Sequence, residues 1–329
     1  MKFDLFAPSR CTTPLPAELE KPYLVAEEKL DGSRYVLYIG GDPYERQTKF
    51  PNTLLSRRVS TVDLKHVDRS LNLPHICEKN YSALEGTVLD GEIQAVDFLA
   101  TNSVMNSAPA LAVQKQKEGG WVRYHVFDVM CFRGKDVRHL PLEQRRKILE
   151  AVVAKMDNEY VKPIKQIAVN LADYFTEIVG KGGEGVIVKD LRLGYGIGWS
   201  KMKKVYDVSC VISGFKAGNG KYESSVGAMA LSVYHKGALV EIGYASGFDD
   251  KLRNEMAKNP EAYIGKVVDV FAQEIQNSKR SADSPVGRLR HPTFNRFRDD
   301  LNAEDCTSEK VAADLAAAKT KRNRFKKEE

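Results

Sequence analysis

The chain has 329 residues, of which 43% are hydrophobic and 29% are charged, and its formal net charge is +6. This composition predicts a globular protein with room for two domains, and the positive charge suits a polyanionic partner without requiring one. No apolar run approaches the roughly 18 residues of a membrane span. The scattered cysteines form no Cys-x-x-Cys pair, so the sequence predicts neither a zinc site nor a disulfide framework and favours the cytoplasm.

The first regular elements follow an irregular, proline-containing lead-in over residues 1–22. Apolar, β-prone residues predict one strand over Tyr23–Ala26 and a second over Arg34–Ile39, with Gly32 free to turn between them. Lys29 is therefore expected at the end of a strand.

Alternating and amphipathic patterns continue to the end of the first predicted domain, near Met202–Val205. They predict three further strands and three helices: strands over Leu84–Val96, Trp121–Phe132 and Gly185–Lys189, and helices over Val104–Lys117, Pro141–Met156 and Leu171–Val179.

Beyond this point short β-prone runs alternate with glycine turns, a spacing typical of a small barrel of the oligonucleotide-binding (OB) type. The predicted strands cover Asp207–Phe215, Ala228–Tyr234, Leu239–Tyr244 and Lys266–Ile275, with a helical insert over Asp249–Asn259. The chain then ends in an Ala-rich and basic segment, for which a frayed terminus and a helix that docks on a partner or on DNA are both open.

Lys29 is followed by an aspartate two residues later and by Arg34 five residues later. A lysine amine can attack a phosphate, and an arginine supplies a fixed charge and a planar donor fork for a phosphate or a ribose. On these residues alone, a surface hairpin with solvated charges is an equal interpretation. Three later segments favour the chemical one, because they add carboxylates and lysines to strands: Asp90-Gly91-Glu92, Glu184–Lys189 and Trp199–Lys203.

In this order the four segments resemble the signature motifs of the covalent nucleotidyltransferases, which comprise DNA ligases, RNA ligases and mRNA capping enzymes. The similarity is closest to the compact ATP-dependent DNA ligases of bacteriophages and extends from about Tyr23 to Asp300. It implies an α+β nucleotidyltransferase (adenylation) domain, similar to ATP-grasp ligases, with antiparallel sheets and helices over residues 1–205. An all-β OB-fold DNA-binding domain over residues 206–303 and a basic tail over residues 304–329 complete the expected architecture.

The resemblance makes Lys29 the nucleophile that forms the lysyl-AMP phosphoramide. It implies contacts to the other parts of ATP as well: Glu27 to adenine, Arg34 and Arg46 to the ribose, Glu92 to the ribose and a metal, Phe127 and Ile187 to the two faces of adenine, and Lys201 and Lys203 to the α-phosphate. Arg46 is also implied to contact the nick phosphate, Glu184 to bind metal, and Arg298 to orient the pyrophosphate.

The chemistry requires such residues independently of the family. An ordinary lysine, with a pKa of about 10.4, is protonated at neutral pH and cannot attack. Nearby cations disfavour this charge and stabilise the charge that develops on the α-phosphate. Arg34, Lys201 and Lys203 would supply them, since a strand period of two puts both lysines on one side. Glu92 and Glu184 offer oxygen ligands that suit Mg²⁺.

Two departures from the family pattern concern the phosphate contacts. The common last motif is Arg-x-Asp-Lys, but Leu301 follows Asp300 in this chain. The loop before Trp199, which is often basic in relatives, offers only Arg192 as a further ATP-binding residue.

The sequence thus predicts an ATP-dependent DNA ligase that uses ATP and Mg²⁺ or another divalent cation. We expect a cytoplasmic monomer, in the host cytoplasm if viral, that clamps nicked duplex DNA through sequence-independent phosphate contacts. Two alternatives stay open. An RNA ligase or a capping guanylyltransferase would use the same lysine, and a non-catalytic OB-fold protein would bind nucleic acid with the first domain as a scaffold.

Overall fold

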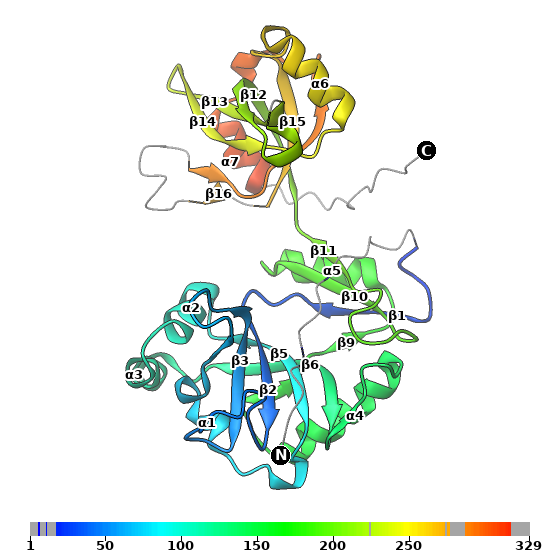
Figure 1. Ribbon diagram of the computed structural model, residues 1–329. Coiled ribbons are helices and arrows are strands. Elements are labelled where there is room, and N and C mark those ends of the chain that lie inside the picture. The colour runs from blue at the N-terminus through cyan, green and yellow to red at the C-terminus, as the bar shows by residue number, and fades with distance from the viewer. Residues whose placement is uncertain are drawn as a thin grey trace. The chain divides into compact units, whose positions relative to one another are not determined.

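The computed structural model describes Phe6, Cys11 and residues 18–223, 225–273, 275–276 and 287–316. The chain divides between Met202 and Lys203 into two compact units, each with its own hydrophobic core (Figure 1). Among the described residues, no helix is long and apolar enough to cross a membrane.

The larger sheet of the first unit has the strand order β4-β3-β2-β5-β6-β7, with β8 paired in parallel to β6. All its other strand pairs are antiparallel. The strands are β2 (Ser33–Ile39), β3 (Asn52–Val59), β4 (His66–Asp68), β5 (Val88–Gln94), β6 (Arg123–Phe132), β7 (Lys135–Asp136) and β8 (Val161–Pro163).

Helices cover one face of this sheet, and their apolar side chains share a single core cluster with alternate residues of β2, β5 and β6. They are α1 (Pro74–Cys77), α2 (Phe98–Met105), α3 (Pro109–Gly119) and α4 (Leu142–Met156). The single helix predicted over Val104–Lys117 is two helices, because Pro109, which lacks an N–H group, begins a new helix.

The smaller sheet has the order β11-β10-β1-β9, and α5 (Leu171–Gly180) packs on one of its faces. Its strands are β1 (Leu24–Glu28), β9 (Gln166–Ile167), β10 (Gly185–Asp190) and β11 (Ser200–Lys203). The strands before and after Gly32 therefore belong to different sheets. The hairpin interpretation of this segment is wrong, since the turn carries the chain from one sheet to the other.

The two sheets meet on their remaining faces. Ala26 and Val188 of the smaller sheet pack with α5, so Glu27 and Lys189, one residue further along each strand, project to the opposite side. There Lys189 lies 5.0 Å from the ring of Phe127, which packs with the uncovered face of the larger sheet. This is the face on which the predicted site residues come together.

The second unit is an OB-fold built on a five-stranded antiparallel sheet with the order β14-β13-β12-β15-β18. Its strands are β12 (Tyr206–Ala217), β13 (Val226–His235), β14 (Ala238–Ala245), β15 (Val267–Ala272) and β18 (Thr293–Phe297), beside the small pair β16 (Ile275–Gln276) and β17 (Arg288–Leu289). Bulges in three of the strand pairs bend the sheet around one core. The predicted strands and the helical insert, α6 (Asp250–Lys258), are confirmed.

The segment that follows β18 differs from the expected tail over residues 304–329. Helix α7 (Ser308–Ala316) begins within it, and both Cys306 and Val311 are buried in the core of the second unit. Burial of these apolar side chains makes the first part of the segment an element of the OB unit. The basic stretch from residue 317 onward lies outside the described residues.

Candidate functional site

Lys29 lies directly beyond the end of β1, where the chain leaves the smaller sheet. Its backbone N–H donates to the carbonyl of Gly185 at 2.9 Å, which continues the β1–β10 pairing by one residue. Its Nζ forms an ion pair with Oε2 of Glu184, the residue before β10, and both side chains are partly exposed. The amine is thus held at the end of a strand, where a ligand can reach it.

Gly32 brings this segment against β5. A Cβ at this position would lie 2.3 Å from the carbonyl oxygen of Ile93 and 2.9 Å from Cγ of Glu92, closer than real atoms approach. Glycine is required here for close packing, and the side chain of Glu92 lies beside the turn. Burial raises the pKa of Glu92 to about 8, and the charges of Lys29 and Arg34 oppose this shift.

Arg34 is held by a buried carboxylate. Its Nε and one terminal nitrogen donate to the two oxygens of Asp90 at 3.0 and 2.5 Å, and the same nitrogen donates to the hydroxyl of Tyr195 at 3.2 Å. The Tyr195 hydroxyl in turn donates to Asp90 at 2.5 Å. Burial and the charge of Asp90 raise the pKa of Tyr195, so this hydroxyl keeps its proton.

Glu27 and Lys189 form a second buried pair, with Nζ and Oε2 2.7 Å apart. The other oxygen of Glu27 accepts from Nε2 of Gln166 at 2.7 Å. Nζ of Lys189 also lies 4.3 Å from the ring of Trp199, a distance at which a cation and an aromatic face attract. A carboxylate and an ammonium therefore meet beside two aromatic rings.

A bulge in β6 sets the position of Phe127. Asp90 pairs with Asp128 and Gly91 with Val126, so Phe127 is the extra residue on its strand. Its ring lies edge-on to Trp199, with centroids 6.0 Å apart, and under the guanidinium of Arg34 at 5.0 Å. Ile187, half-buried and directly opposite Glu27 on β10, belongs to the same region.

Strand β11 places Lys201 and Lys203 on one side, as predicted. Ser200 and Met202 are buried, whereas Lys201 is exposed and Lys203 half-buried. The two ammonium groups thus project from the edge of the smaller sheet.

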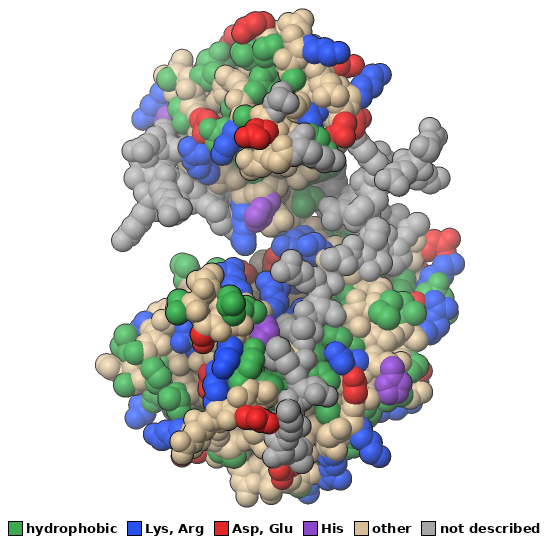
Figure 2. All heavy atoms as spheres, in the orientation of Figure 1, with side chains coloured by type: hydrophobic (Ala, Val, Ile, Leu, Met, Phe, Trp, Pro, Cys, Tyr) green, Lys and Arg blue, Asp and Glu red, His purple; other side chains and the backbone are tan. Residues whose placement is uncertain are grey.

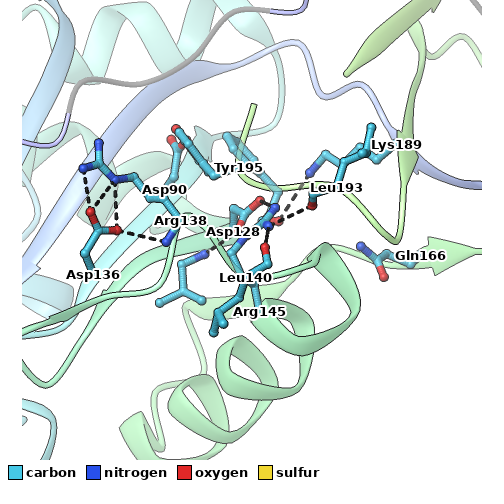
Figure 3. Close-up of polar contacts among 12 residues, drawn as sticks. Asp90, Asp128, Asp136, Arg138, Leu140, Arg145, Gln166, Lys189, Leu193 and Tyr195 are labelled. Carbon is cyan, nitrogen blue, oxygen red and sulfur yellow. Dashed lines mark hydrogen bonds and ion pairs between the residues drawn. The ribbon is translucent and has the colours of Figure 1, made fainter. Parts of the chain in front are cut away.

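The rings of Phe127 and Trp199 form an aromatic wall. A fully buried ion pair supports this wall (Figure 3). Arg145 of α4 reaches both oxygens of Asp128, next to Phe127, at 2.8 and 2.9 Å. It also donates to the carbonyls of Leu140 and Leu193 at 2.5 and 3.1 Å. Because Leu193 lies in the β10–β11 loop, which also carries Tyr195 and Trp199, one side chain ties this loop to α4 and β6.

Arg46 lies in the loop between β2 and β3. It forms an ion pair with the buried carboxylate of Asp42 at 2.6 Å and packs over the ring of Tyr44 at 4.9 Å. These contacts hold the guanidinium of Arg46 and leave part of its side chain exposed.

Two further predicted ATP-binding residues are Arg192, which lies away from this cluster, and Arg298, which belongs to the other unit. Arg192 pairs with Asp190 at 2.7 Å and stacks on Tyr23, at the opposite end of β1 from Lys29. Arg298 belongs to the second unit, where it pairs with Asp269 of β15 and with Asp300.

The predicted metal site rests on carboxylates alone. Among the described residues, no group of three or more His, Cys, Asp or Glu side chains is arranged to hold a metal ion. Glu92 and Glu184 have the oxygen donors that suit Mg²⁺, which is commonly bound by one or two carboxylates together with substrate phosphates. The donor set therefore fits a cation that arrives with a phosphate ligand.

Fold and site together define a nucleotidyltransferase domain followed by an OB-fold unit. A family model described as "ATP dependent DNA ligase domain" matches residues 11–206. Because this match covers more than half of the chain, the protein belongs to the ATP-dependent DNA ligase domain family.

Individual relatives with similar sequences are described as DNA ligases. The chain is 33% identical over 214 residues to a DNA ligase of Methanopyrus kandleri, covering 58% of this chain and 38% of that protein. It is 28% identical over 311 residues to a DNA ligase of Saccharolobus islandicus (strain L.S.2.15 / Lassen #1), covering 78% and 50%. The chain thus spans half or less of the length of these curated relatives.

Solved structures share the fold. One described as "DNA binding with a minimal scaffold: Structure-function analysis of Lig E DNA ligases" aligns with a TM-score of 0.61 and 18% identity over 89% of this chain and all of that one. Another, "Pmar-Lig_Pre.", aligns with a TM-score of 0.59 and 21% identity over 84% of this chain and 63% of that one.

Sequence reasoning missed the groups that hold the site residues in place. Asp90 and Lys189 belong to the motif segments, but no role was predicted for either of them. Nothing in the sequence pattern singles out Tyr195, Gln166 or Arg145. A charged residue within an apolar run, such as Lys189 after Val186–Val188, was the one available hint.

Proposed function

We propose that the protein is a DNA ligase that uses ATP to seal nicks in duplex DNA through a lysyl-AMP intermediate on Lys29. The observation that carries this proposal is one accessible lysine amine at the end of β1, beside Glu184. Arg34 and Glu92 lie on the neighbouring sheet, and the charges of Lys29 and Arg34 both act on the carboxylate of Glu92.

In the first step, Nζ of Lys29 attacks the α-phosphorus of ATP. A P–N bond forms, the bond from the α-phosphorus to the bridging oxygen breaks, and pyrophosphate leaves. Nζ must lose a proton before it attacks, and Glu184, whose carboxylate contacts it, is placed to accept that proton. Arg34, Lys201 and Lys203 are assigned to the charge that develops on the phosphate.

Adenine is assigned to the wall formed by Phe127, Ile187, Glu27 and Lys189. Adenine presents a donor at its exocyclic amine and an acceptor at the adjacent ring nitrogen. The carboxylate of Glu27 and the ammonium of Lys189, 2.7 Å apart, offer the complementary acceptor and donor. Phe127 and Ile187 supply apolar surface for the two faces of the base.

Glu92 and Glu184 are the residues that would hold a divalent cation, and the ribose contacts are assigned to Arg34, Arg46 and Glu92. When bound, such a cation supplies charge neutralisation for the phosphates. Glu184→Ala should change the dependence of adenylylation on Mg²⁺ concentration. An unchanged dependence would remove Glu184 from the metal site.

The later steps concern DNA. AMP passes from Lys29 to the 5′-phosphate of a nick, and the 3′-hydroxyl then displaces AMP to form the phosphodiester. Arg46 is assigned to the nick phosphate, and binding should be salt-dependent and independent of sequence. The monomeric state, the clamp on DNA, the cytoplasmic location and the bacteriophage origin all stay predictions.

Arg298 is assigned to the pyrophosphate. It is paired with Asp269 and with Asp300 at 2.7 Å, so it has to leave at least one of these carboxylates to reach a nucleotide. Asp300 is exposed, so releasing this partner costs little, whereas Asp269 of β15 is buried.

The test is to incubate the protein with radiolabelled ATP and Mg²⁺, and then to map any acid-labile, base-stable adduct. We expect label on Lys29 that is discharged by nicked duplex DNA, and none on Lys29→Ala or on Lys29→Arg, which keeps the charge. Both variants should still bind nicked DNA.

Other outcomes distinguish the alternatives. Labelling by GTP in place of ATP would favour a capping enzyme, and discharge by nicked RNA alone would favour an RNA ligase. No label, in protein first stripped of AMP with pyrophosphate, would favour a non-catalytic OB-fold binder.

A further inference from the structure

Gln166 of β9 holds one oxygen of the Glu27 carboxylate, and the proposed chemistry gives it no role. It lies directly opposite Glu27 in the β1–β9 pairing, and Ile187 lies directly opposite Glu27 in the β1–β10 pairing. Because directly opposed side chains project to the same face of a sheet, these three residues form one row across three strands. Gln166 therefore approaches Glu27 from the side away from Ile187, which is assigned to a face of adenine.

The Glu27 carboxylate depends on these neighbours because it is buried. The visible face of the first unit carries many exposed Lys, Arg, Asp and Glu side chains (Figure 2), but Glu27 and Lys189 are each only 1% exposed. Nζ of Lys189 lies 2.7 Å from Oε2 of Glu27, and Nε2 of Gln166 donates to Oε1 at 2.7 Å. Removing either donor leaves a buried oxygen poorly paired, since little water reaches it.

The two donors together fix an orientation that one alone leaves open. The carboxylate of a glutamate turns easily about its last side-chain bond, because a torsion between a tetrahedral and a planar carbon has broad minima. The ammonium of Lys189 has three donors and can follow such a turn, whereas the planar amide of Gln166 on the other oxygen restrains it. Both oxygens act as acceptors here, and each has a further lone pair for a ligand.

A base can read this carboxylate from the open side of the row. Gln166 and Ile187 are half-buried, so the row is partly accessible beside Glu27. The exocyclic amine of adenine is a donor, and its hydrogen bond weakens steeply when the acceptor is turned out of line. A base without this amine gains nothing from the orientation of the carboxylate.

We propose that Gln166 is a positioning residue for base recognition. It fixes the plane of the Glu27 carboxylate, and it thereby gives the site its preference for adenine over a purine that lacks the exocyclic amine. This inference rests on the proposed function, because it takes adenine as the base that contacts Glu27. It adds to that function a residue that acts through Glu27.

The test compares Gln166→Leu and Gln166→Ala with Gln144→Leu, the same change at an exposed glutamine of α4. Adduct formation on Lys29 is followed over a range of concentrations of ATP or of purine riboside triphosphate, which has a hydrogen in place of the exocyclic amine. Leucine removes the donor. Alanine also removes it but leaves room for water at Oε1, so this variant should stay folded even if Gln166→Leu does not.

We expect the half-saturating concentration of ATP to rise about tenfold in Gln166→Leu, as for the loss of a hydrogen bond to a charged group. That of the analogue should change by less than about twofold, and the maximal rate with ATP should stay within about twofold. Gln166→Ala should show a smaller shift in the same direction, and Gln144→Leu should match the parent protein. Equal shifts for both nucleotides would indicate general loosening and overturn the inference, as would no shift in either Gln166 variant.

The parent protein separates the two proposals. If neither nucleotide forms an adduct, the proposed function fails and the inference falls with it. If both nucleotides form the adduct at equal concentrations, the proposed function stands and the Gln166 inference is overturned, because the site does not read the amine. A preference for ATP in the parent that narrows in both Gln166 variants supports the inference.

Discussion

Charged side chains are organised differently in the two units. In the first unit they form buried one-to-one pairs, such as Arg34 with Asp90 and Arg145 with Asp128. In the second unit one buried carboxylate, Asp269, is shared by the more exposed Arg296 and Arg298, with Arg298 also paired to Asp300. Arg298 lowers the pKa of Asp300 to about 2, so this exposed pair persists over the working pH range.

The difference shows which charges are fixed and which can exchange partners. Removing one member of a buried pair leaves the other charge without water or a partner, so the geometry of the first unit is held firmly. Arg298 can release the exposed carboxylate of Asp300 at small cost, because water replaces the lost contact. The first unit thus holds its buried charges in fixed pairs, and the second presents an arginine that can exchange one exposed partner.

The strongest challenge to this comparison is Arg145→Met. Because Asp128 would be left charged and fully buried, we expect a loss of about 3–5 kcal/mol in the free energy of unfolding. Denaturant unfolding measures it, with Arg145→Met/Asp128→Leu as the control that removes both charges and should recover part of the loss. Equal stability of the parent and the single variant would contradict the view of this pair as the support of the aromatic wall.

A second test uses the raised pKa of Glu92, about 8 against an ordinary value of 4.5. The folded state holds this proton more tightly than the unfolded chain, so the contribution of Glu92 to stability is present below about pH 4.5 and is lost as the pH rises to about 8. Glu92→Gln should remove this dependence and raise stability at pH 8 by about 1–2 kcal/mol, a value reduced for partial exposure, while lowering adenylylation. Thermal unfolding at pH 5 and pH 8 measures the effect, and identical pH profiles would refute it.

A smaller effect is expected of Tyr195→Phe. This change removes the hydroxyl shared by Asp90 and Arg34 and keeps the ring against Trp199. We expect about 1 kcal/mol of lost stability and about a fivefold higher KM for ATP. Tyr38→Phe is the control, since its buried hydroxyl bonds the backbone of Phe6. A higher KM in both variants would assign the effect to general loosening.

The smallest change in stability should come from Arg298→Met. Asp269 keeps Arg296 and the hydroxyl of Ser209, so unfolding should shift by less than about 1 kcal/mol. Adenylylation should nevertheless slow if Arg298 orients the pyrophosphate. A large destabilisation would show that the second unit depends on its ion pairs as the first unit does.

Much of the architecture follows from local patterns. Period-two alternation predicts β6 and the amphipathic period predicts α4, because each pattern reports one buried face. Short β-prone runs predict β10 and the strands β12 to β15 of the OB unit. The strand β3 was missed, since its second half, Ser56–Val59, is polar and exposed and resembles a loop. The placement of Lys29 at a strand end follows equally from local pattern, because the β-prone run stops just before it.

By itself, the sequence determined the order of the motifs, the strand-end lysine and the two-unit organisation. Only the tertiary structure decided which charges face each other, because an ion pair such as Glu27 with Lys189 joins residues far apart in the chain through the register of two strands. It likewise separated Arg192 from the site and brought Tyr195 into it. Strand register and sheet packing set these distances, and neither is encoded in the spacing of any one segment.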